Sequence, residues 1–322
     1  MNKIEFGSCL EIMQRWINDG VKVNTCVTSP PYYGLRDYGT ATWKGGDSKC
    51  SHMRDTKFSE NTITGHKNFK EMNGVGDAIY KTSCPRCGAV REDEQLGLEE
   101  TPENYINNMV KVFRLVRKLL TDDGTLWVNI GDSYSSGKRK STTSQSLRGN
   151  TKYGVTRPPV IEGIKQKDLI GIPWMLAFAL RADGWYLRQD IIWHKPNPMP
   201  ESVKDRCTKS HEYIFLLSKS PKYYFDYESI KESTVDLTGK RNKRDVWTVN
   251  VKPYKDAHFA VFPKELIDPC IKAGCPDGGI VLDPFMGSGT TAEVAVENNK
   301  KYLGCELNDT YKNLQQNRIP MI

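Results

Sequence analysis

The chain has 322 residues, a formal net charge of +7 and a pI near 8.8. Its length suits one elaborated domain or two modest ones, and its mild basic bias is compatible with a polyanionic partner without requiring one. No apolar run approaches the length that crosses a bilayer, and the N-terminus lacks the charged-then-apolar order of a signal peptide. We therefore expect a cytoplasmic protein that does not contact a membrane.

The first part of the chain starts as alternating strands and helices and is then interrupted. Residues 1–9 are predicted to form a strand, 10–18 a helix and 21–27 a second, buried strand. Residues 39–98 are polar, Gly-rich and almost without periodicity. An irregular stretch of this length inside a compact domain requires a function or a local staple. We therefore interpret 39–98 as an inserted subdomain.

The middle of the chain returns to a regular pattern. Thr101 is an N-cap candidate followed by Pro at the first helical position, and apolar residues then recur at helical spacing up to Leu120. Two Asp residues and a Gly predict a turn into a strand at 125–130. Residues 133–160 are rich in Ser, Thr, Gly, Lys and Arg, which predicts a flexible loop.

The rest of the chain alternates between helices and strands. Residues 220–256 are charged and aromatic without strong periodicity and interrupt this alternation. The pattern predicts an α/β fold with a mainly parallel sheet that helices cover on both faces. The predicted elements are helix 170–182, strands 186–193 and 213–217, helix 263–272, strand 279–282, helix 290–299, strand 302–306 and helix 310–317.

A glycine-rich motif follows the predicted strand 279–282. Its glycines permit positive φ and let a ligand approach the backbone, and the helix that follows offers free N–H groups. The next strand ends at Glu306, where a carboxylate can accept both hydroxyls of a ribose. A tight strand-to-helix turn would explain Gly-Ser-Gly alone equally well, but the full string is more specific. It consists of Asp283, Pro284, Phe285, Met286, Gly287, Ser288, Gly289, Thr290 and Thr291.

A second motif, Thr28-Ser29-Pro30-Pro31-Tyr32, follows the buried strand 21–27. Each proline lacks an N–H and forces the preceding residue toward an extended conformation, so the carbonyls of Ser29 and Pro30 can face a cleft as acceptors. Such acceptors beside an aromatic face suit the exocyclic amino group of a flipped base. The alternative is a rigid turn in which Tyr32 only packs. Both motifs lie where open α/β sheets bind ligands, outside the carboxyl ends of strands.

With these two motifs the chain resembles the DNA amino-methyltransferases, which transfer a methyl group from S-adenosylmethionine to N4 of cytosine or N6 of adenine. Residues 29–32 match the family's Asp/Asn/Ser-Pro-Pro-Tyr/Phe motif, and 283–291 resembles its cofactor motif. The catalytic motif comes first, which is the circularly permuted order of the family's β group. The resemblance implies one Rossmann-like domain of the class I methyltransferase type over residues 1–322.

The resemblance also implies the site residues. Ser29, Pro30, Pro31 and Tyr32 would be catalytic. The N-terminal strand departs from the family pattern, which ends Gly-Asp where this chain has Gly7-Ser8. The cofactor-binding residues implied by the resemblance are Ser8, Cys9, Thr28, Phe262, Pro263, Asp283, Pro284, Phe285, Gly287, Ser288, Gly289, Thr290, Thr291 and Glu306.

The implied reaction is direct attack of the amino nitrogen on the sulfonium methyl, without a covalent enzyme intermediate. Ser29 preceded by Thr28 resembles the N4-cytosine members, so we favour cytosine, with adenine as the alternative. A methyltransferase acting on RNA or protein and an inactive nucleic-acid-binding module are further alternatives. The intact motifs argue against the inactive module, and the permuted order argues against RNA or protein.

Nine cysteines in a reducing compartment argue against a disulfide framework. Cys50, His52, Cys84 and Cys87 instead offer thiolate and imidazole ligands inside the insertion. Cys-x2-Cys followed by Gly is typical of a zinc knuckle, and a structural Zn²⁺ would replace the core that the insertion lacks. Free surface cysteines beside an incidental histidine are the alternative.

The expected partner is double-stranded DNA. Lys and Arg clusters at 138–140 and 240–244 can meet phosphates, although a solvated surface explains each cluster equally well. Base readout is expected from the insertion, the 133–160 loop or 220–256, which is the candidate target-recognition region. The resemblance also suggests a cognate restriction endonuclease that acts separately, a monomer or homodimer, and the cytoplasm of a bacterium, an archaeon or a phage-infected host.

Overall fold

The computed structural model describes residues 2–34, 38, 40–52, 83–135, 163–234, 236, 238–252 and 262–319. Most of the predicted flexible loop, the centre of the insertion and the 138–140 cluster lie outside the described residues.

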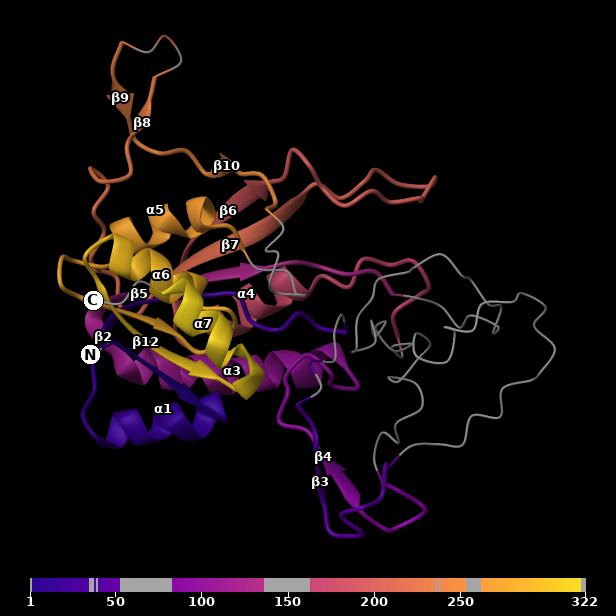
Figure 1. Ribbon diagram of the computed structural model, residues 1–322. Coiled ribbons are helices and arrows are strands. Elements are labelled where there is room, and N and C mark those ends of the chain that lie inside the picture. The colour runs from indigo at the N-terminus through magenta and orange to yellow at the C-terminus, as the bar shows by residue number, and fades with distance from the viewer. Residues whose placement is uncertain are drawn as a thin grey trace.

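An eight-stranded sheet runs through the molecule in the order β1-β12-β11-β2-β5-β7-β6-β10 (Figure 1). Neighbouring strands pair in parallel, except that β7 is antiparallel to both β5 and β6. The predicted mainly parallel sheet is therefore confirmed. The strands are β1 (Asn2–Phe6), β2 (Val23–Thr28), β5 (Leu120–Ile130), β6 (Tyr186–His194), β7 (His211–Ser218), β10 (Val246–Thr248), β11 (Ile280–Asp283) and β12 (Lys301–Glu306).

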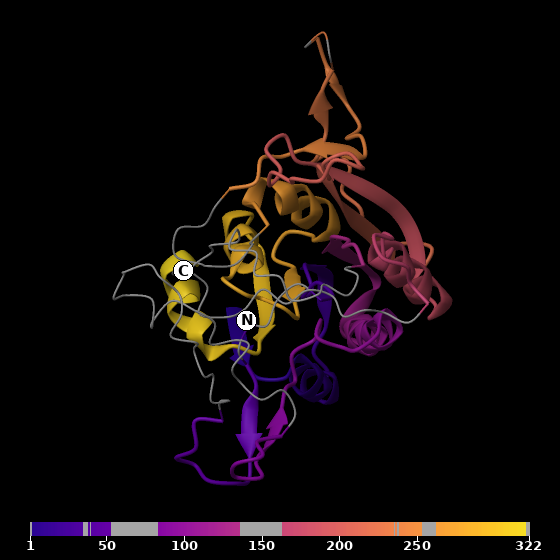
Figure 2. The same ribbon diagram turned by 90° about the vertical axis from the view of Figure 1, so that its right-hand side faces the viewer.

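Helices cover both faces of the sheet (Figure 2). Successive residues of a strand point to opposite faces, so Cys26 belongs to one core and its neighbour Val27 to the other. The Cys26 face is covered by α1 (Cys9–Asn18), α3 (Pro102–Leu119) and α4 (Ile172–Ala182), and the Val27 face by α5 (Lys264–Gly274) and α6 (Thr290–Glu297). The 3-10 helix η1 (Asp309–Tyr311) and α7 (Lys312–Arg318) follow β12.

Helix α3 shows how the sequence builds this covering layer. The Thr101 hydroxyl accepts the N–H of Asn104 at 3.2 Å, and Pro102 occupies the first turn, as predicted. Tyr105 and Phe113, on the apolar face of the helix, are completely buried. Burial of one such side chain contributes roughly 1.5–3 kcal/mol, which anchors the helix against the sheet.

The predicted strand 125–130 is paired with both neighbours, β2 and β7, but the strand extends further back, to Leu120, than the predicted turn implied. Strand β5 runs without interruption from Leu120 to Ile130, and a register shift in its pairing with β2 falls between Val23 and Thr25. Lys219 donates to the carbonyl of Leu120 and to Asp122 at 2.9 Å each, which ties this part of β5 to the end of β7. In the pairing with β2, Leu120 lies opposite Val23 and the next pair is Thr125 with Thr25, so Asp-Asp-Gly forms a bulge inside β5.

Two hairpins project from opposite ends of the molecule (Figures 1 and 2). Within the insertion, β3 (Thr42–Lys44) pairs antiparallel with β4 (Val90–Glu92). Within 220–256, β8 (Glu232–Ser233) pairs antiparallel with β9 (Lys240–Arg241). Neither pair of strands was predicted, because both segments lack a periodic pattern of apolar residues. None of the described helices combines the length and apolarity that crossing a membrane requires.

Candidate functional site

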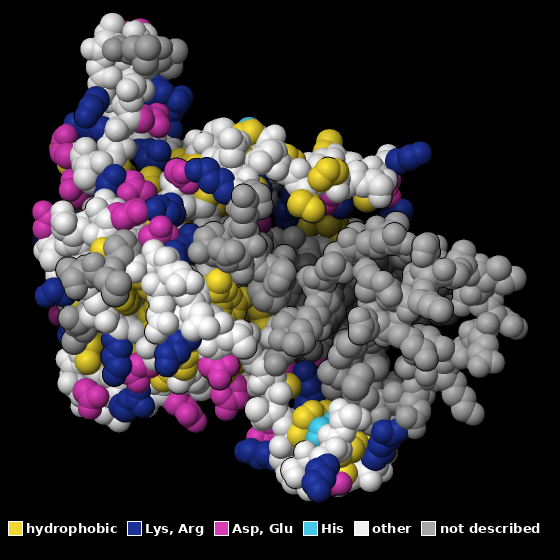
Figure 3. All heavy atoms as spheres, in the orientation of Figure 1, with side chains coloured by type: hydrophobic (Ala, Val, Ile, Leu, Met, Phe, Trp, Pro, Cys, Tyr) yellow, Lys and Arg dark blue, Asp and Glu magenta, His cyan; other side chains and the backbone are white. Residues whose placement is uncertain are grey.

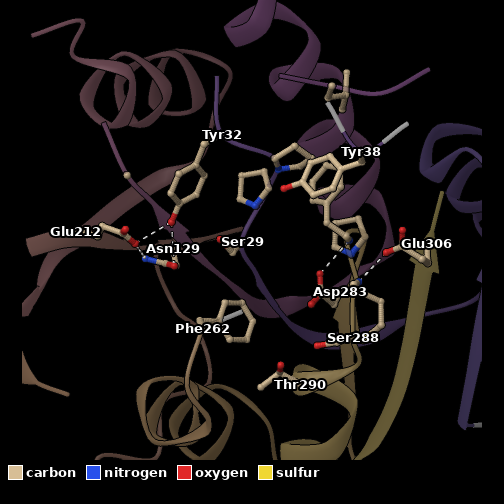
Figure 4. Close-up of a pocket in the computed structure, with 18 of the residues that line it drawn as sticks. Ser29, Tyr32, Tyr38, Asn129, Glu212, Phe262, Asp283, Ser288, Thr290 and Glu306 are labelled. Atoms are coloured by element: carbon tan, nitrogen blue, oxygen red, sulfur yellow. Dashed lines mark hydrogen bonds between the residues drawn. The ribbon is translucent and has the colours of Figure 1, made fainter. Parts of the chain in front are cut away.

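A cavity of about 850 Å³ lies outside the carboxyl ends of the parallel strands, where both motifs meet (Figure 4). This is the position expected for a ligand site in an open α/β sheet. Most of the predicted site residues line it, namely Ser8, Cys9, Ser29, Pro30, Pro31, Tyr32, Phe262, Asp283, Pro284, Phe285, Gly287, Ser288, Thr290 and Glu306.

Thr28 and Thr291 do not line the cavity but hold Asp283 from behind. The Thr28 hydroxyl donates to Asp283 Oδ1 and the Thr291 hydroxyl to Asp283 Oδ2, each at 2.6 Å. The N–H of Phe285 adds a third donor to Oδ1 at 2.9 Å. One carboxylate therefore joins the end of β2, the loop after β11 and the start of α6. We call this arrangement the Asp283 clamp.

Burial sets the protonation of this clamp. Asp283 is 1% exposed, and desolvation raises its pKa to about 6 despite its hydroxyl and N–H donors. At neutral pH the carboxylate is thus mostly ionised, which makes both of its oxygens acceptors for the two threonines.

Glu306 closes the other side of the glycine-rich loop. Its Oε2 accepts the N–H of Gly287 at 2.6 Å and its Oε1 accepts the N–H of Asn308 at 2.8 Å. Burial raises the pKa of Glu306 to about 7, and the nearby charge of Asp283 acts in the same direction. Each oxygen keeps lone pairs beyond those N–H groups, so the carboxylate still offers acceptors toward the cavity.

The backbone of the loop after β11 has the shape that its glycines predict. Gly287 has φ 53° and Gly289 has φ 89°, both in the left-handed region, and Gly289 is the N-cap of α6. Helix α7 supports this loop, because Gln315 donates to the carbonyl of Gly287 at 2.7 Å and Arg318 to the Ser288 hydroxyl at 2.7 Å. Pro263 lies at the start of α5 and does not line the cavity.

Tyr32 points to the side of the cavity away from Glu306 (Figure 4). Its hydroxyl lies 2.8 Å from Glu212 Oε2 and 3.2 Å from Asn129 Oδ1. The carbonyl of Pro31 accepts the phenol of Tyr105 at 2.9 Å, which fixes the motif to α3. The aromatic residue of the motif is therefore anchored at both its backbone and its hydroxyl.

The sequence did not single out Glu212 or Asn129. Strand β7 runs opposite to its neighbours, so its first residues, rather than those that follow it, lie at the carboxyl edge of the sheet. A search for polar residues after strands therefore misses Glu212. Asn129 belongs to β5 itself, two residues before Gly131, which lines the cavity together with Asp132.

The insertion contributes a wall of the cavity. Tyr38, Thr40, Glu94, Gln95 and Leu96 line it, beside the base of the β3–β4 hairpin. Gln95 Oε1 accepts the N–H of Tyr38 at 2.7 Å, and Figure 4 places Tyr38 on the same side as Glu306. The irregular composition of this segment gave no signal for these residues.

At the tip of the β3–β4 hairpin, the ligand atoms of Cys50, His52, Cys84 and Cys87 all lie within 4.8 Å of one another. The Sγ atoms of Cys50 and Cys84 are 3.8 Å apart, and Cys87 Sγ lies 3.5 Å from His52 Nδ1. A tetrahedral Zn²⁺ with bonds of about 2.3 Å to sulfur and about 2.0 Å to nitrogen requires edges of roughly 3.5–3.8 Å. The Cys50–Cys84 and Cys87–His52 distances match edges of a tetrahedral site, and the four predicted ligands are brought together within 4.8 Å.

The backbone around this cluster is built closely against the sulfur atoms. A Cβ at Gly46, which has φ 70°, would lie 2.8 Å from Cys87 Sγ. N–H groups of Asp47 and Ala89 lower the pKa of the Cys87 thiol, as expected for a thiolate ligand. Figure 3 shows Lys and Arg side chains around the His at the tip of this hairpin.

The basic cluster at 240–244 is less available to phosphates than the sequence suggested. Arg241 and Arg244 both pair with Glu232, at 3.0 and 2.9 Å, and Lys243 lies over the ring of Trp247 at 5.0 Å. Part of this positive charge is therefore neutralised within the hairpin.

The sequence matches a family model described as DNA methylase, of the N6/N4 methyltransferase class, over residues 23–317. The Type II methyltransferase M.SmaI of Serratia marcescens is 45% identical, with 98% of this chain and 90% of the relative covered. The Type II methyltransferase M.Cfr9I of Citrobacter freundii is 44% identical, with coverages of 97% and 86%.

Solved structures share the fold at low identity. The PvuII DNA methyltransferase, described as cytosine-N4-specific, superimposes with a TM-score of 0.59 at 15% identity, covering 100% of this chain and 87% of its own. A putative DNA modification methylase of Thermus thermophilus in complex with S-adenosylmethionine gives 0.57 at 19%, with coverages of 99% and 93%. This chain therefore belongs to the S-adenosylmethionine-dependent DNA amino-methyltransferases of the N4-cytosine/N6-adenine family, in their circularly permuted β group.

Proposed function

We propose that this enzyme methylates N4 of a cytosine that is flipped out of double-stranded DNA into the Tyr32 side of the cavity. The main support for this proposal is the Asp283 clamp. It fixes the Ser-Pro-Pro-Tyr motif against the cofactor loop through the 2.6 Å hydrogen bond between Thr28 and Asp283. Support for cytosine comes from the hydroxyl residue at Ser29 and from the fold shared with a cytosine-N4-specific enzyme.

The cavity residues fit S-adenosylmethionine, which supplies an electrophilic methyl group on a sulfonium. Glu306 has the acceptors that ribose hydroxyls need, and the backbone at Gly287, which lines the cavity, permits close approach. Phe262, at the cavity wall opposite the clamp, would cover the methionine part (Figure 4). The other predicted cofactor residues that line the cavity keep their proposed roles, namely Ser8, Cys9, Pro284, Phe285, Ser288 and Thr290. Thr28 and Thr291 would act through the clamp, and Pro263 and Gly289 do not line the cavity.

On the other side, the carbonyls of Ser29 and Pro30 would accept the two N–H groups of the target amine. That contact orients the nitrogen and increases its electron density, while the ring of Tyr32 stacks on the base. Cys9 also lines the cavity, but burial raises the pKa of its thiol to about 12. The thiol stays protonated at neutral pH, which agrees with transfer that uses no cysteine nucleophile.

N6 of adenine is the second candidate, because Ser29 presents the same acceptors to either amino group. Membership of a DNA methylase family argues against RNA or protein as substrate, and the intact clamp argues against an inactive binding module. The relatives are Type II methyltransferases, so a separately acting cognate endonuclease is the proposed partner in the cell. We retain a monomer or homodimer as the proposed assembly and 220–256 as the proposed target-recognition region.

The target base is tested by incubating the wild-type enzyme with duplex DNA and tritiated S-adenosylmethionine, followed by nucleoside mass spectrometry. We expect N4-methylcytosine. N6-methyladenine would overturn the choice of base and leave the site intact, whereas label in RNA but not in DNA would overturn the proposed substrate. Boiled enzyme is the control for adventitious labelling.

The affinity for the cofactor should depend on pH. Asp283 and Glu306 take up protons as the pH falls through about 6 and about 7, respectively, and so lose their attraction for a sulfonium. Because binding of the cation favours the ionised carboxylates, affinity rises with pH, by up to about tenfold per unit for each coupled group. Calorimetry between pH 5.5 and 8 should show this rise for S-adenosylmethionine.

S-adenosylhomocysteine is the matched control, because it has the same α-amino, carboxylate, ribose and adenine groups but an uncharged thioether without the methyl group. We expect its affinity to change much less over the same range. Identical pH profiles for the two ligands would show that the buried carboxylates do not sense the sulfonium.

We also propose that Cys50, His52, Cys84 and Cys87 hold a structural Zn²⁺ that supports the cofactor side of the cavity. The spacing of the four ligand atoms carries the metal assignment. The β3–β4 ladder connects this cluster to Thr40, Glu94 and Gln95 at the cavity wall. Without the metal, the hairpin has little apolar core to hold that wall in place.

Metal analysis of purified protein should find about one zinc per chain, and Cys84→Ser should abolish it. Chelation should also weaken binding of S-adenosylmethionine, measured by calorimetry, because the Tyr38–Gln95 wall is no longer held. Cys207→Ser, at an exposed cysteine outside the cluster, is the matched control and should retain both properties. Undamaged wild-type protein without zinc would refute the assignment.

A further inference from the structure

A cluster of polar side chains surrounds the hydroxyl of Tyr32 in the cavity (Figure 4). The proposed methyl transfer gives the partners of Tyr32 in this cluster no role. Glu212 Oε2 lies 2.8 Å from this hydroxyl, and Glu212 Oε1 pairs with the ammonium of Lys195. Asn129 completes the cluster, with Oδ1 at 3.2 Å from the same hydroxyl. We call Tyr32, Asn129, Lys195 and Glu212 the Tyr32 anchor.

The direction of the hydrogen bonds in this anchor is fixed. Burial, followed by the negative charge of Glu212, raises the pKa of Tyr32 well above its usual value. The phenol therefore keeps its proton and donates it to an acceptor. Asn129 Nδ2 donates to the carbonyl of Tyr213 at 3.1 Å, which turns its oxygen toward Tyr32. The tyrosine is held as a donor and does not act as a proton acceptor.

The ion pair in the anchor is not explained by a gain in stability. The side chains of Lys195 and Glu212 are only 16% and 17% exposed, so both charges are largely removed from water. The attraction between partly buried charges often only offsets this desolvation, and apolar residues of similar size would stabilise as well. A largely buried pair at the wall of a catalytic cavity is therefore better explained by what it holds in place.

The ring of Tyr32 is also confined from the side. A Cβ at Gly131 would lie 2.7 Å from Tyr32 Cε2 and 3.3 Å from Glu212 Cδ. The absence of a side chain at Gly131 thus lets the ring lie close to the backbone at the end of β5. With its hydroxyl held by Glu212 and its edge against Gly131, the ring has one orientation in the cavity.

We propose that Glu212 is a positioning residue for methyl transfer, which fixes the ring of Tyr32 at the angle at which the flipped base stacks. This inference rests on the proposed role of Tyr32. Lys195 acts one step further away, because its ammonium holds the other oxygen of the Glu212 carboxylate. A ring that turns away would let the target amine leave the line of attack, and small misplacements of this kind cost about 10²-fold in rate.

The test is a double-mutant cycle between Tyr32→Phe and Glu212→Gln, read as single-turnover methyl transfer to duplex DNA. Tyr32→Phe removes only the donor, and Glu212→Gln keeps the shape but weakens the acceptor and breaks the ion pair with Lys195. We expect each single variant to lower the rate, by roughly tenfold for Glu212→Gln within the range of positioning effects. The double variant should be no slower than the slower single variant.

Two further readouts separate positioning from a general structural effect. Affinity for S-adenosylmethionine, measured by calorimetry, should stay within about twofold of wild type in all three variants, because the anchor lies on the other side of the cavity. Glu11→Ala, at an exposed acid on α1, is the matched control and should retain the wild-type rate.

Rate losses that multiply in the double variant would show that Glu212 acts on something other than Tyr32, and a wild-type rate in Glu212→Gln would also overturn the inference. Loss of cofactor affinity in every variant would show that Tyr32 and Glu212 support the fold and not the orientation of the base. If wild-type enzyme transfers no methyl group to DNA, the proposed function fails first, and that result is distinct from all of these.

Discussion

The site depends on one buried carboxylate. Asp283 accepts hydrogen bonds from the hydroxyls of Thr28 and Thr291, at 2.6 Å each. Thr28 directly precedes the Ser-Pro-Pro-Tyr motif, and Thr291 lies in the first turn of α6. Strands β2 and β11 are direct neighbours in the sheet, so the clamp spans adjacent strands rather than distant loops. An ionised group buried to this degree is costly unless its acceptors are filled, and here three donors fill them. The geometry of the amine side and that of the cofactor side are therefore set by the same atoms.

Around this clamp, separate parts of the chain complete the two halves of the cavity. The cofactor half is closed by Glu306, by α7 through Gln315, and by the base of the insertion through Tyr38. The base half is closed by the Tyr32 anchor, whose acid is supplied by the antiparallel strand β7. The circular permutation is compatible with this arrangement, because spatial adjacency of β2 and β11 does not depend on which of them comes first in the chain.

Much of the fold and of the candidate site could be predicted from local sequence. Hydrophobic strands followed by Ser-Pro-Pro-Tyr and by Gly-Ser-Gly predicted the two motifs that meet at the cavity, and the spacing of cysteines predicted the Cys/His cluster, because these features are short and local. Glu212 was missed because an antiparallel strand brings its beginning, instead of its end, to the functional edge. Tyr38 and Gln95 were missed because a polar insertion carries no periodic signal. At Asp122 the local turn preference produces a bulge inside β5, between the pair Leu120–Val23 and the pair Thr125–Thr25, instead of a separate turn. The pairing of Arg241 with Glu232 was not predicted because it depends on the hairpin fold.

The Asp283 clamp couples the proposed catalytic motif to the cofactor loop, and the isosteric variant Thr28→Val removes one of its hydrogen bonds. Single-turnover transfer to duplex DNA and affinity for S-adenosylmethionine should be measured on the same preparation, with Tyr32→Ala for comparison. We expect Thr28→Val to impair both quantities, whereas Tyr32→Ala should abolish transfer and leave cofactor affinity intact. A wild-type rate of transfer together with wild-type affinity in Thr28→Val would contradict the coupling of the two motifs by the Asp283 clamp.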